Sequence, residues 1–219
     1  MEKAQDVHLR KDENGVYREG AGMVLRVAYA ELLERLKPSR LSGELLVRAA
    51  KLKSGPALPV AIDATAGLGE DALLLAAAGF DVLLFEHDPI IAALLKDAVR
   101  RARETPALSC AAGRMHVFEE DSVAALGRMD KAPDLVYLDP MFPERRKSAA
   151  VKKKFQLLQR LEAPQEDAQA LLQAAIAAGP QKIVIKRPLK GPSLGDVKPS
   201  HSVRGKAVRF DVIVLPQAR

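Results

Sequence analysis

The sequence predicts a doubly wound α/β domain with a small N-terminal extension. Its length of 219 residues suits one domain, and 48% hydrophobic residues suffice for a sizeable core. From residue 60 onward, short apolar runs alternate with longer segments of helical periodicity. The first of these runs stops at a loop of small residues, as a strand-to-helix turn does. This alternation is typical of successive βαβ units and therefore of a mostly parallel sheet.

The N-terminal part is predicted to form a hairpin followed by two helices. Asn14-Gly15 is a preferred pair for a tight hairpin turn and lies between the two short runs of 7–18. Leucine, valine and alanine recur at three- and four-residue spacing over 24–36 and over 42–52. Lys37-Pro38-Ser39 interrupts this pattern, so we expect two amphipathic helices.

A linker at Ser54-Gly55-Pro56 divides the chain into an N-terminal part, 1–55, a candidate RNA-contacting appendage, and a main domain, 56–219. Apolar runs in the main domain predict seven strands, over 60–64, 81–86, 115–118, 135–138, 182–186, 201–203 and 208–215. Helical periodicity predicts helices over 71–79, 89–103 and 164–178. We expect the last two strands to pair as an antiparallel hairpin, and ligands to bind beyond the carboxyl ends of the strands.

The composition excludes several classes of protein. A single cysteine, Cys110, forms neither an internal disulfide nor a Cys-rich zinc site, and we expect no metal. No stretch approaches the roughly 18 apolar residues of a membrane span. The first twelve residues are charged and lack the apolar core of a secretory signal, so we expect a cytoplasmic protein with no membrane partner.

Positive charge is concentrated in two segments. Residues 141–160 hold seven Lys or Arg and one acid, and residues 181–210 hold eight and one, so together they carry +13. Because the whole chain carries +6, the other 169 residues carry −7. An acidic body with two basic segments favours a nucleic-acid partner, although Lys152 to Lys154 alone also fit a solvated helix face.

The first strand of the main domain ends in a glycine-rich turn that begins at Asp63. Gly67 and Gly69 allow a tight turn and a close approach to a ligand, and the helix that follows offers free N–H groups. We therefore expect Asp63, Gly67 and Gly69 to line a nucleotide-like cofactor. With Ala72 the glycines also satisfy the dinucleotide fingerprint, and a purely geometric role for them stays open.

Acidic residues follow the next two strands. Glu86 comes at about the offset at which a carboxylate accepts from two ribose hydroxyls, or else it caps the helix that starts near Pro89. Asp121 or Ser122 is expected to bind the exocyclic amine of the cofactor base, unless the pair only caps the next helix.

The fourth strand ends in Asp139-Pro140-Met141-Phe142-Pro143, the most specific chemical motif of the chain. The Asp139 carboxylate and the Pro140 carbonyl suit the two N–H groups of an amino-bearing base, and Phe142 suits stacking on that base. A proline-rich turn around a buried phenylalanine is the alternative. Phosphate contacts beside this loop are expected from the basic residues Arg145, Arg146, Lys147, Lys152, Lys153, Lys186 and Arg187. A lysine at a strand end is also commonly just solvated.

Taken together, these motifs resemble the RsmJ family of S-adenosylmethionine-dependent methyltransferases, which have the class I, Rossmann-like fold and methylate a guanine N2 in 16S ribosomal RNA. The matching residues are 63–69, Glu86, 138–143, 147–149, 151–153 and 184–188, and the resemblance covers about 60–215. It implies S-adenosylmethionine as cofactor, S-adenosylhomocysteine as product, and ribosomal RNA or the small ribosomal subunit as partner. The cofactor contacts that it implies are Glu70, Asp71, Glu86, His87, Asp121, Ser122 and Asp139.

Other functions stay open at this point. The same motifs suit an amino methyltransferase that acts on another RNA or on DNA adenine. The glycine loop alone permits a nicotinamide-dependent oxidoreductase, and the fold alone permits an RNA-binding protein without catalysis.

Overall fold

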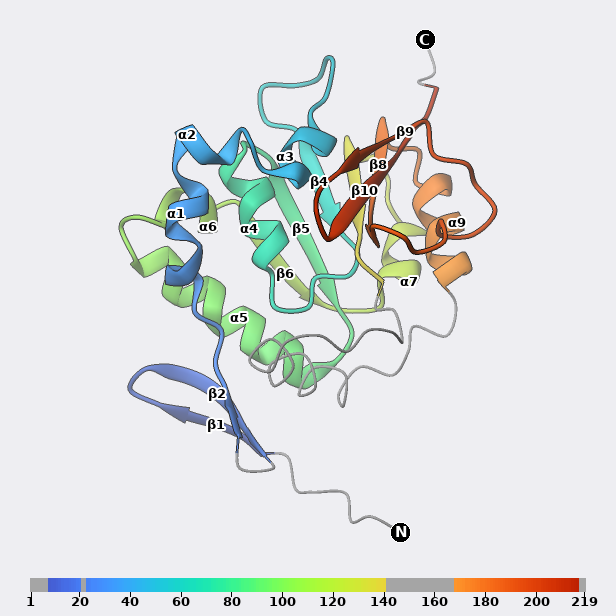
Figure 1. Cartoon of the computed structure of the whole chain (residues 1–219). Helices are drawn as coiled ribbons and strands as arrows, with labels where there is room; N and C mark the ends of the chain where they lie inside the picture. Colours follow the sequence, from blue (N-terminus) through green and yellow to red (C-terminus); the bar gives the residue numbers. More distant parts are fainter. Residues whose placement is uncertain (1–7, 21–22, 141–167, 217–219) are drawn as a thin grey trace.

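A seven-stranded sheet forms the centre of the protein, whose computed structural model describes residues 8–20, 23–140 and 168–216 (Figure 1). The strands lie in the order β6-β5-β4-β7-β8-β10-β9. Their bounds are β4 (Val60–Asp63), β5 (Asp81–Glu86), β6 (Met115–Glu119), β7 (Leu135–Leu138), β8 (Lys182–Pro188), β9 (His201–Arg204) and β10 (Val208–Val214). All seven predicted strands are confirmed to within two residues.

Strands β4 to β8 pair in parallel, and β10 pairs antiparallel with both β8 and β9. The predicted doubly wound sheet with an antiparallel C-terminal hairpin is therefore confirmed. Its parallel strands read as nearly continuous apolar runs because both of their faces are covered. The carboxyl ends of β4, β5, β6, β7 and β8 lie along one edge, where a ligand site is expected.

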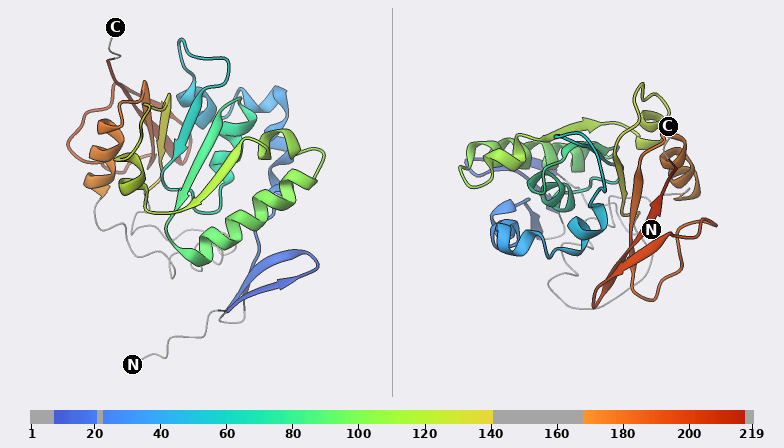
Figure 2. Two further views of the ribbon diagram at one scale, coloured as in Figure 1. Left: turned by 180° about the vertical axis from the view of Figure 1, so that it is seen from behind. Right: turned by 90° about the horizontal axis from the view of Figure 1, so that it is seen from above.

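Helices cover both faces of the sheet (Figure 2). On one side, which we call the α4–α5 face, α4 (Glu70–Ala77) and α5 (Pro89–Glu104) pack on Ala61, Leu84 and Tyr137. On the α7–α9 face, α7 (Ser122–Leu126) and α9 (Ala168–Ala177) pack on Ile62 and Val136. A short helix, α6 (Ser109–Ala112), precedes β6. Because successive strand residues point to opposite faces, the two faces can carry different chemistry.

The N-terminal part begins with a small antiparallel sheet of β1 (His8–Asp12), β2 (Gly15–Gly20) and β3 (Met23–Leu25). The predicted hairpin is confirmed, since Asp12 pairs with Gly15 across the turn. The helix predicted to start at Val24 is wrong at its beginning, because Val24 pairs with Glu19 of β2. This tertiary pairing outweighs the helical spacing of the apolar residues.

Helical structure in the N-terminal part starts only at η1 (Tyr29–Leu32) and continues through α1 (Leu33–Leu36). Two further short helices follow, α2 (Pro38–Leu41) and α3 (Leu45–Ala50), so the helix predicted over 42–52 is shorter than expected. Lys37 is extended, with ψ of 134°, as residues before proline tend to be. The proline therefore separates α1 from α2.

The N-terminal part shares the core of the α4–α5 face. Leu25, Tyr29 and Leu46 belong to the same buried cluster as the apolar residues of α4 and α5. Asp97 of α5 accepts a hydrogen bond from the Val16 amide at 3.0 Å. Side chains from both sides of residue 55 therefore build one core. The division of the chain into two domains at residue 55 stays a prediction.

Candidate active site

The turn after β4 contains two glycines with different surroundings. Both are left-handed, with φ of 50° at Gly67 and 73° at Gly69. A Cβ on Gly69 would lie 2.5 Å from the Tyr29 hydroxyl and 2.6 Å from a Leu95 methyl, so this glycine is required by packing. Among the described residues, a Cβ on Gly67 would meet only the Thr65 carbonyl, at 3.9 Å. Gly67 therefore borders open space that can admit a ligand.

Glu86, at the end of β5, is tied to this turn. Its Oε2 accepts from the Gly67 amide at 3.0 Å, and its Oε1 accepts from the Asp88 amide at 2.9 Å. Burial raises its pKa. The helix-capping alternative for Glu86 is wrong, because Asp88 caps α5 by accepting from two helix amides. His87 is exposed, with its Nδ1 3.6 Å from Glu86 Oε1.

After β6, Asp121 is the N-cap of α7. Its Oδ1 accepts from the Ala124 amide at 2.8 Å, and Ser122 begins the helix as a buried residue. The capping role that the sequence left open is therefore present. A contact of this pair with a cofactor base stays a prediction.

Asp139 follows β7 directly and is held by two neighbouring segments. Its amide donates to Thr65 Oγ1 at 2.7 Å, and its Oδ2 accepts from Lys186 Nζ at 2.8 Å. Its side chain keeps 37% exposure. Removal of water by the surrounding protein raises its pKa, and the Lys186 ammonium opposes that shift. Pro140 is buried.

Lys186 lies between two carboxylates on the α4–α5 face. Its Nζ is 2.7 Å from Asp71 Oδ2, in addition to its contact with Asp139. Tyr137 Oη donates to the same Asp71 oxygen at 2.6 Å. Burial raises the pKa of Asp71, but Lys186, the Tyr137 hydroxyl and the charge of Arg35 together outweigh burial, and the net shift is downward. We call Asp71, Tyr137, Asp139 and Lys186 the front cluster.

Asp63 lies beneath this cluster and is almost fully buried. Its Oδ1 accepts from the Thr65 amide at 3.1 Å. Burial raises its pKa to about 8, so the carboxyl is mostly protonated at neutral pH. The front cluster therefore carries one cation and two carboxylates, and one excess negative charge remains.

Arg187 points to the opposite face of β8 and is only 1% exposed. Its Nε donates to the Pro192 carbonyl at 2.8 Å, and burial lowers its pKa to about 10. The predicted phosphate contact of Arg187 is not supported, because its guanidinium is buried in this arrangement. The ammonium of Lys186 is likewise already engaged, in ion pairs with Asp71 and Asp139.

Several predicted residues lie outside the described part of the chain. They are Phe142, Arg145, Arg146, Lys147, Lys152 and Lys153. Conversely, Tyr29, Thr65 and Tyr137 belong to the site but were not predicted from the sequence. Tyr137 stands two residues before Asp139 in a strand, and the period of two would have placed both on one face.

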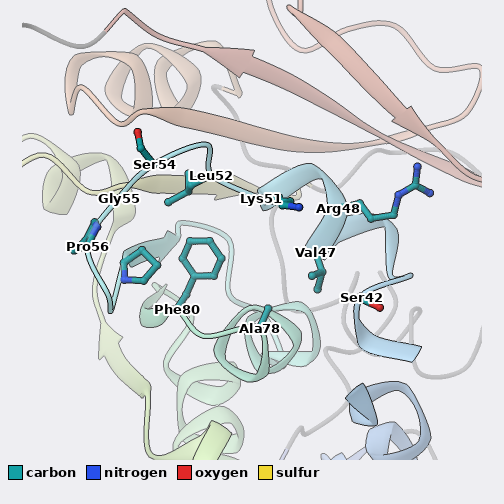
Figure 3. Close-up of a pocket in the computed structure, with 11 residues that line it drawn as sticks. Ser42, Val47, Arg48, Lys51, Leu52, Ser54, Gly55, Pro56, Ala78 and Phe80 are labelled. Carbon is teal, nitrogen blue, oxygen red and sulfur yellow. The ribbon is translucent and has the colours of Figure 1, made fainter. Parts of the chain in front are cut away.

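A pocket of about 720 Å³ lies at the other end of the sheet (Figure 3). Pro59, just before β4, and Phe80, just before β5, line it, so it is at the amino ends of these strands. Arg48 and Lys51 from the region of α3 border it. It is therefore separate from the site around Asp139.

Within the described ranges, no group of three His, Cys, Asp or Glu side chains is arranged to hold a metal ion. Among the helices of those same ranges, none has the length and apolar character needed to cross a membrane.

Comparison with known proteins identifies the family. A family described as "Putative SAM-dependent methyltransferase" matches residues 3–215. The chain is 44% identical over 172 residues to the ribosomal RNA small subunit methyltransferase J of Pseudomonas aeruginosa, covering 78% of this chain and 66% of that protein. It is 42% identical over 174 residues to the protein of the same name from Aeromonas salmonicida, covering 79% and 70%.

The chain thus spans just under two thirds of the length of the first of these relatives. Among solved structures, the SAM-dependent methyltransferase NGO1261 of Neisseria gonorrhoeae matches with a TM-score of 0.78 at 30% identity, covering 100% of this chain and 87% of that one. The rRNA methyltransferase aviRa of Streptomyces viridochromogenes shares the fold, with a TM-score of 0.52 at 17% identity. The family match over nearly the whole chain and the identity to these relatives show that the chain belongs to the SAM-dependent methyltransferases, and the resemblance to the RsmJ family is confirmed.

Proposed function

We propose that this protein transfers a methyl group from S-adenosylmethionine to the exocyclic N2 amine of a guanine in 16S ribosomal RNA. The observation that carries the proposal is the half-exposed Asp139 carboxylate beside the glycine turn, at the carboxyl edge of the sheet. The relatives named ribosomal RNA small subunit methyltransferase J support the choice of substrate. Ribosomal RNA or the small subunit is then the partner, and the cytoplasm is the location.

The donor set of the site suits S-adenosylmethionine, which when bound supplies a methyl group already activated by its sulfonium. Glu86 is oriented by two backbone amides, and each of its oxygens has capacity for a further donor such as a ribose hydroxyl. Gly67 borders open space, and the excess negative charge of the front cluster favours a cationic ligand. Asp63, Gly69, Glu70, Asp71, His87, Asp121 and Ser122 complete the proposed cofactor site.

Asp139 has the geometry to orient an amine. Among the described residues, the hydrogen bonds of its carboxylate run through Oδ2, which leaves Oδ1 for an N–H group of the target base. The Pro140 carbonyl is proposed to accept the second N–H, and Phe142 to stack on the base. As the amine nitrogen bonds to the methyl carbon, the bond from that carbon to the sulfonium sulfur would break and leave the neutral thioether. The amine must also release one proton, which Asp139 Oδ1 is placed to accept. Most of the rate enhancement then comes from alignment.

The proposed RNA contacts are Arg145, Arg146, Lys147, Lys152 and Lys153, which follow the Asp139 loop in the sequence. Because phosphate contacts release counterions, binding that uses them weakens as salt rises.

Methylation of purified small subunits from a strain without the gene tests the proposal. With labelled S-adenosylmethionine, we expect N2-methylguanosine in the digested ribosomal RNA, and about 100-fold less of it with Asp139→Ala. Asp196→Ala, which removes an exposed acid, is the control. DNA from the same strain is supplied in a parallel reaction. Label in its adenine with none in the ribosomal RNA, or full activity of Asp139→Ala, would contradict the proposal.

A further inference from the structure

We propose that Lys186 is a positioning residue for methyl transfer, and not a phosphate contact. In this arrangement its ammonium holds Asp139 by Oδ2, so that Oδ1 faces the target amine. The inference rests on the proposed function. It assigns a positioning role to Lys186, a residue that the sequence pattern had placed on an RNA-binding surface.

Three elements converge on Lys186 Nζ. Lys186 belongs to β8, Asp139 follows β7, and Asp71 lies in the first turn of α4. Leu138 pairs with Ile185 in the parallel ladder, so the next residues, Asp139 and Lys186, lie level with each other. Their contact is therefore built into the strand register, and does not depend on a flexible surface side chain.

A phosphate would have to compete with both carboxylates for this ammonium. Nζ is 2.7 Å from Asp71 Oδ2 and 2.8 Å from Asp139 Oδ2, and the side chain is only 29% exposed. Together the two carboxylates raise the pKa of Lys186 despite its burial. Because the ammonium is already paired and partly desolvated, a further anion gains little from it.

Loss of Lys186 would leave Asp71 and Asp139 as neighbouring acids without their common cation. Two close carboxylates resist ionising together, so one of them takes up a proton more readily. Asp71 retains the Tyr137 hydroxyl as a donor. Among the described residues, the remaining contact of Asp139 is made by its backbone amide, which donates to Thr65 Oγ1 and leaves the carboxylate without a donor. Asp139 is then the acid that becomes protonated, and a protonated Asp139 can no longer take up the proton that the amine releases.

The experiment compares Lys186→Met with Lys190→Met in the full chain. Lys190 is an exposed lysine four residues further on, so its variant reports the loss of one surface charge. We expect Lys186→Met to lower the single-turnover rate at saturating RNA by about 100-fold, as misplacement of a reacting group does. RNA affinity and its salt dependence should equal those of the wild type.

The acid limb of the pH–rate profile distinguishes positioning from a structural effect. It should move up by about one pH unit in Lys186→Met, because the nearby cation is lost. Lys186→Arg, which keeps the charge, should retain the wild-type limb with a lower rate. This variant also serves if Lys186→Met fails to fold, since a shifted limb in a folded Lys186→Arg protein would contradict the proposal.

A readout without substrate separates this inference from the proposed function. In NMR titrations of side-chain carboxyl carbons, assigned with Asp139→Asn, the Asp139 pKa should rise in Lys186→Met and not in Lys190→Met. An unmoved Asp139 titration overturns the inference, whether or not the wild type methylates RNA. A near-normal rate with weaker, less salt-dependent RNA binding would overturn it too and identify Lys186 as a phosphate contact.

Discussion

Lys186 and Arg187 are consecutive residues of β8, yet they lie in two charged clusters on opposite faces of the sheet. Lys186 belongs to the front cluster, on the α4–α5 face. Arg187 lies opposite Arg209 of β10, on the α7–α9 face. Arg209, Asp211 and Ser202 form what we call the back cluster.

The two clusters differ in how far their polar atoms are satisfied. Arg209 Nε and Nη2 donate to the two Asp211 oxygens at 2.9 and 3.0 Å. Its Nη1 donates to the carbonyls of Pro188, Leu189 and Gly191. Asp211 also accepts from Ser202 Oγ and is 2% exposed, whereas Asp139 of the front cluster is 37% exposed.

This difference separates a structural ion pair from a site. The back cluster ties the loop after β8 to β10, and its carboxylate is enclosed. The front cluster keeps one carboxylate open to a ligand and carries excess negative charge, at some expense in stability. Buried ionisable groups in such an open arrangement are candidates for function.

The largest effect on stability is expected from Asp211→Ala. It leaves Arg209 buried without its counter-charge, so the free energy of unfolding should fall by about 3–5 kcal/mol. Asp139→Ala should cost less than about 1 kcal/mol, because that pair is partly solvated. Urea denaturation followed by circular dichroism measures both, with Asp196→Ala as an exposed control. Equal losses for Asp211→Ala and Asp139→Ala would contradict the distinction between a structural ion pair and an open site.

A smaller effect is expected from Tyr137→Phe in the front cluster. The variant removes only the hydroxyl that donates to the ionised Asp71, at a cost of about 2 kcal/mol. Lys186 stays between its two carboxylates, so the methylation rate should fall less than in Lys186→Met. The same unfolding titration and a single-turnover assay test this. A rate loss as large as that of Lys186→Met would mean that Tyr137 and Lys186 act as one unit.

The third effect is a difference in pH dependence. With a pKa of about 8, folded Asp63 keeps a proton that the unfolded chain loses near pH 4. The stability due to this group is therefore complete below about pH 4 and is lost as pH rises toward 8. Between pH 5 and pH 8 the free energy of unfolding of Asp63→Asn should therefore rise by at least about 1 kcal/mol relative to that of the wild type.

Asp211 has the opposite sign. Burial raises its pKa, but the hydrogen bonds from Arg209 and Ser202 and the nearby positive charges together outweigh burial, and the net shift is downward. Its contribution is thus present at neutral pH and is lost as pH falls into the acid range. Unfolding titrations from pH 5 to pH 8 measure the contrast, and identical slopes for Asp63→Asn and wild type would contradict the prediction for Asp63.

The sequence allowed most of the sheet to be predicted, because alternating strands and helices leave a local signal. The start of β3 could not be predicted, since Val24 is extended only through its pairing with β2. The period of two in a strand predicts that Lys186 and Arg187, at the end of β8, point to opposite faces of the sheet. Their surroundings could not be predicted, because Arg209 lies 22 positions beyond Arg187 and comes opposite it through the antiparallel register.

In the site, the residues that follow strands were predictable and those that support them were not. Asp139 and Glu86 stand out because they lie at the carboxyl ends of strands, where ligands of this fold bind. Tyr29 had no such signal, because its partner, Leu68, is 39 residues away. The role of Lys186 depended on Asp71, which approaches from a helix.

Tyr29 also links the N-terminal part to the glycine turn. Its hydroxyl donates to the Leu68 carbonyl at 2.9 Å, and the hydroxyl occupies the space that a side chain at position 69 would need. Local opening of η1 would therefore remove the support of the turn, and a ligand that orders the turn must also slow that opening. Slower amide hydrogen exchange in η1 would then report that a ligand occupies the site at the glycine turn, to which Tyr29 is linked through the Leu68 carbonyl.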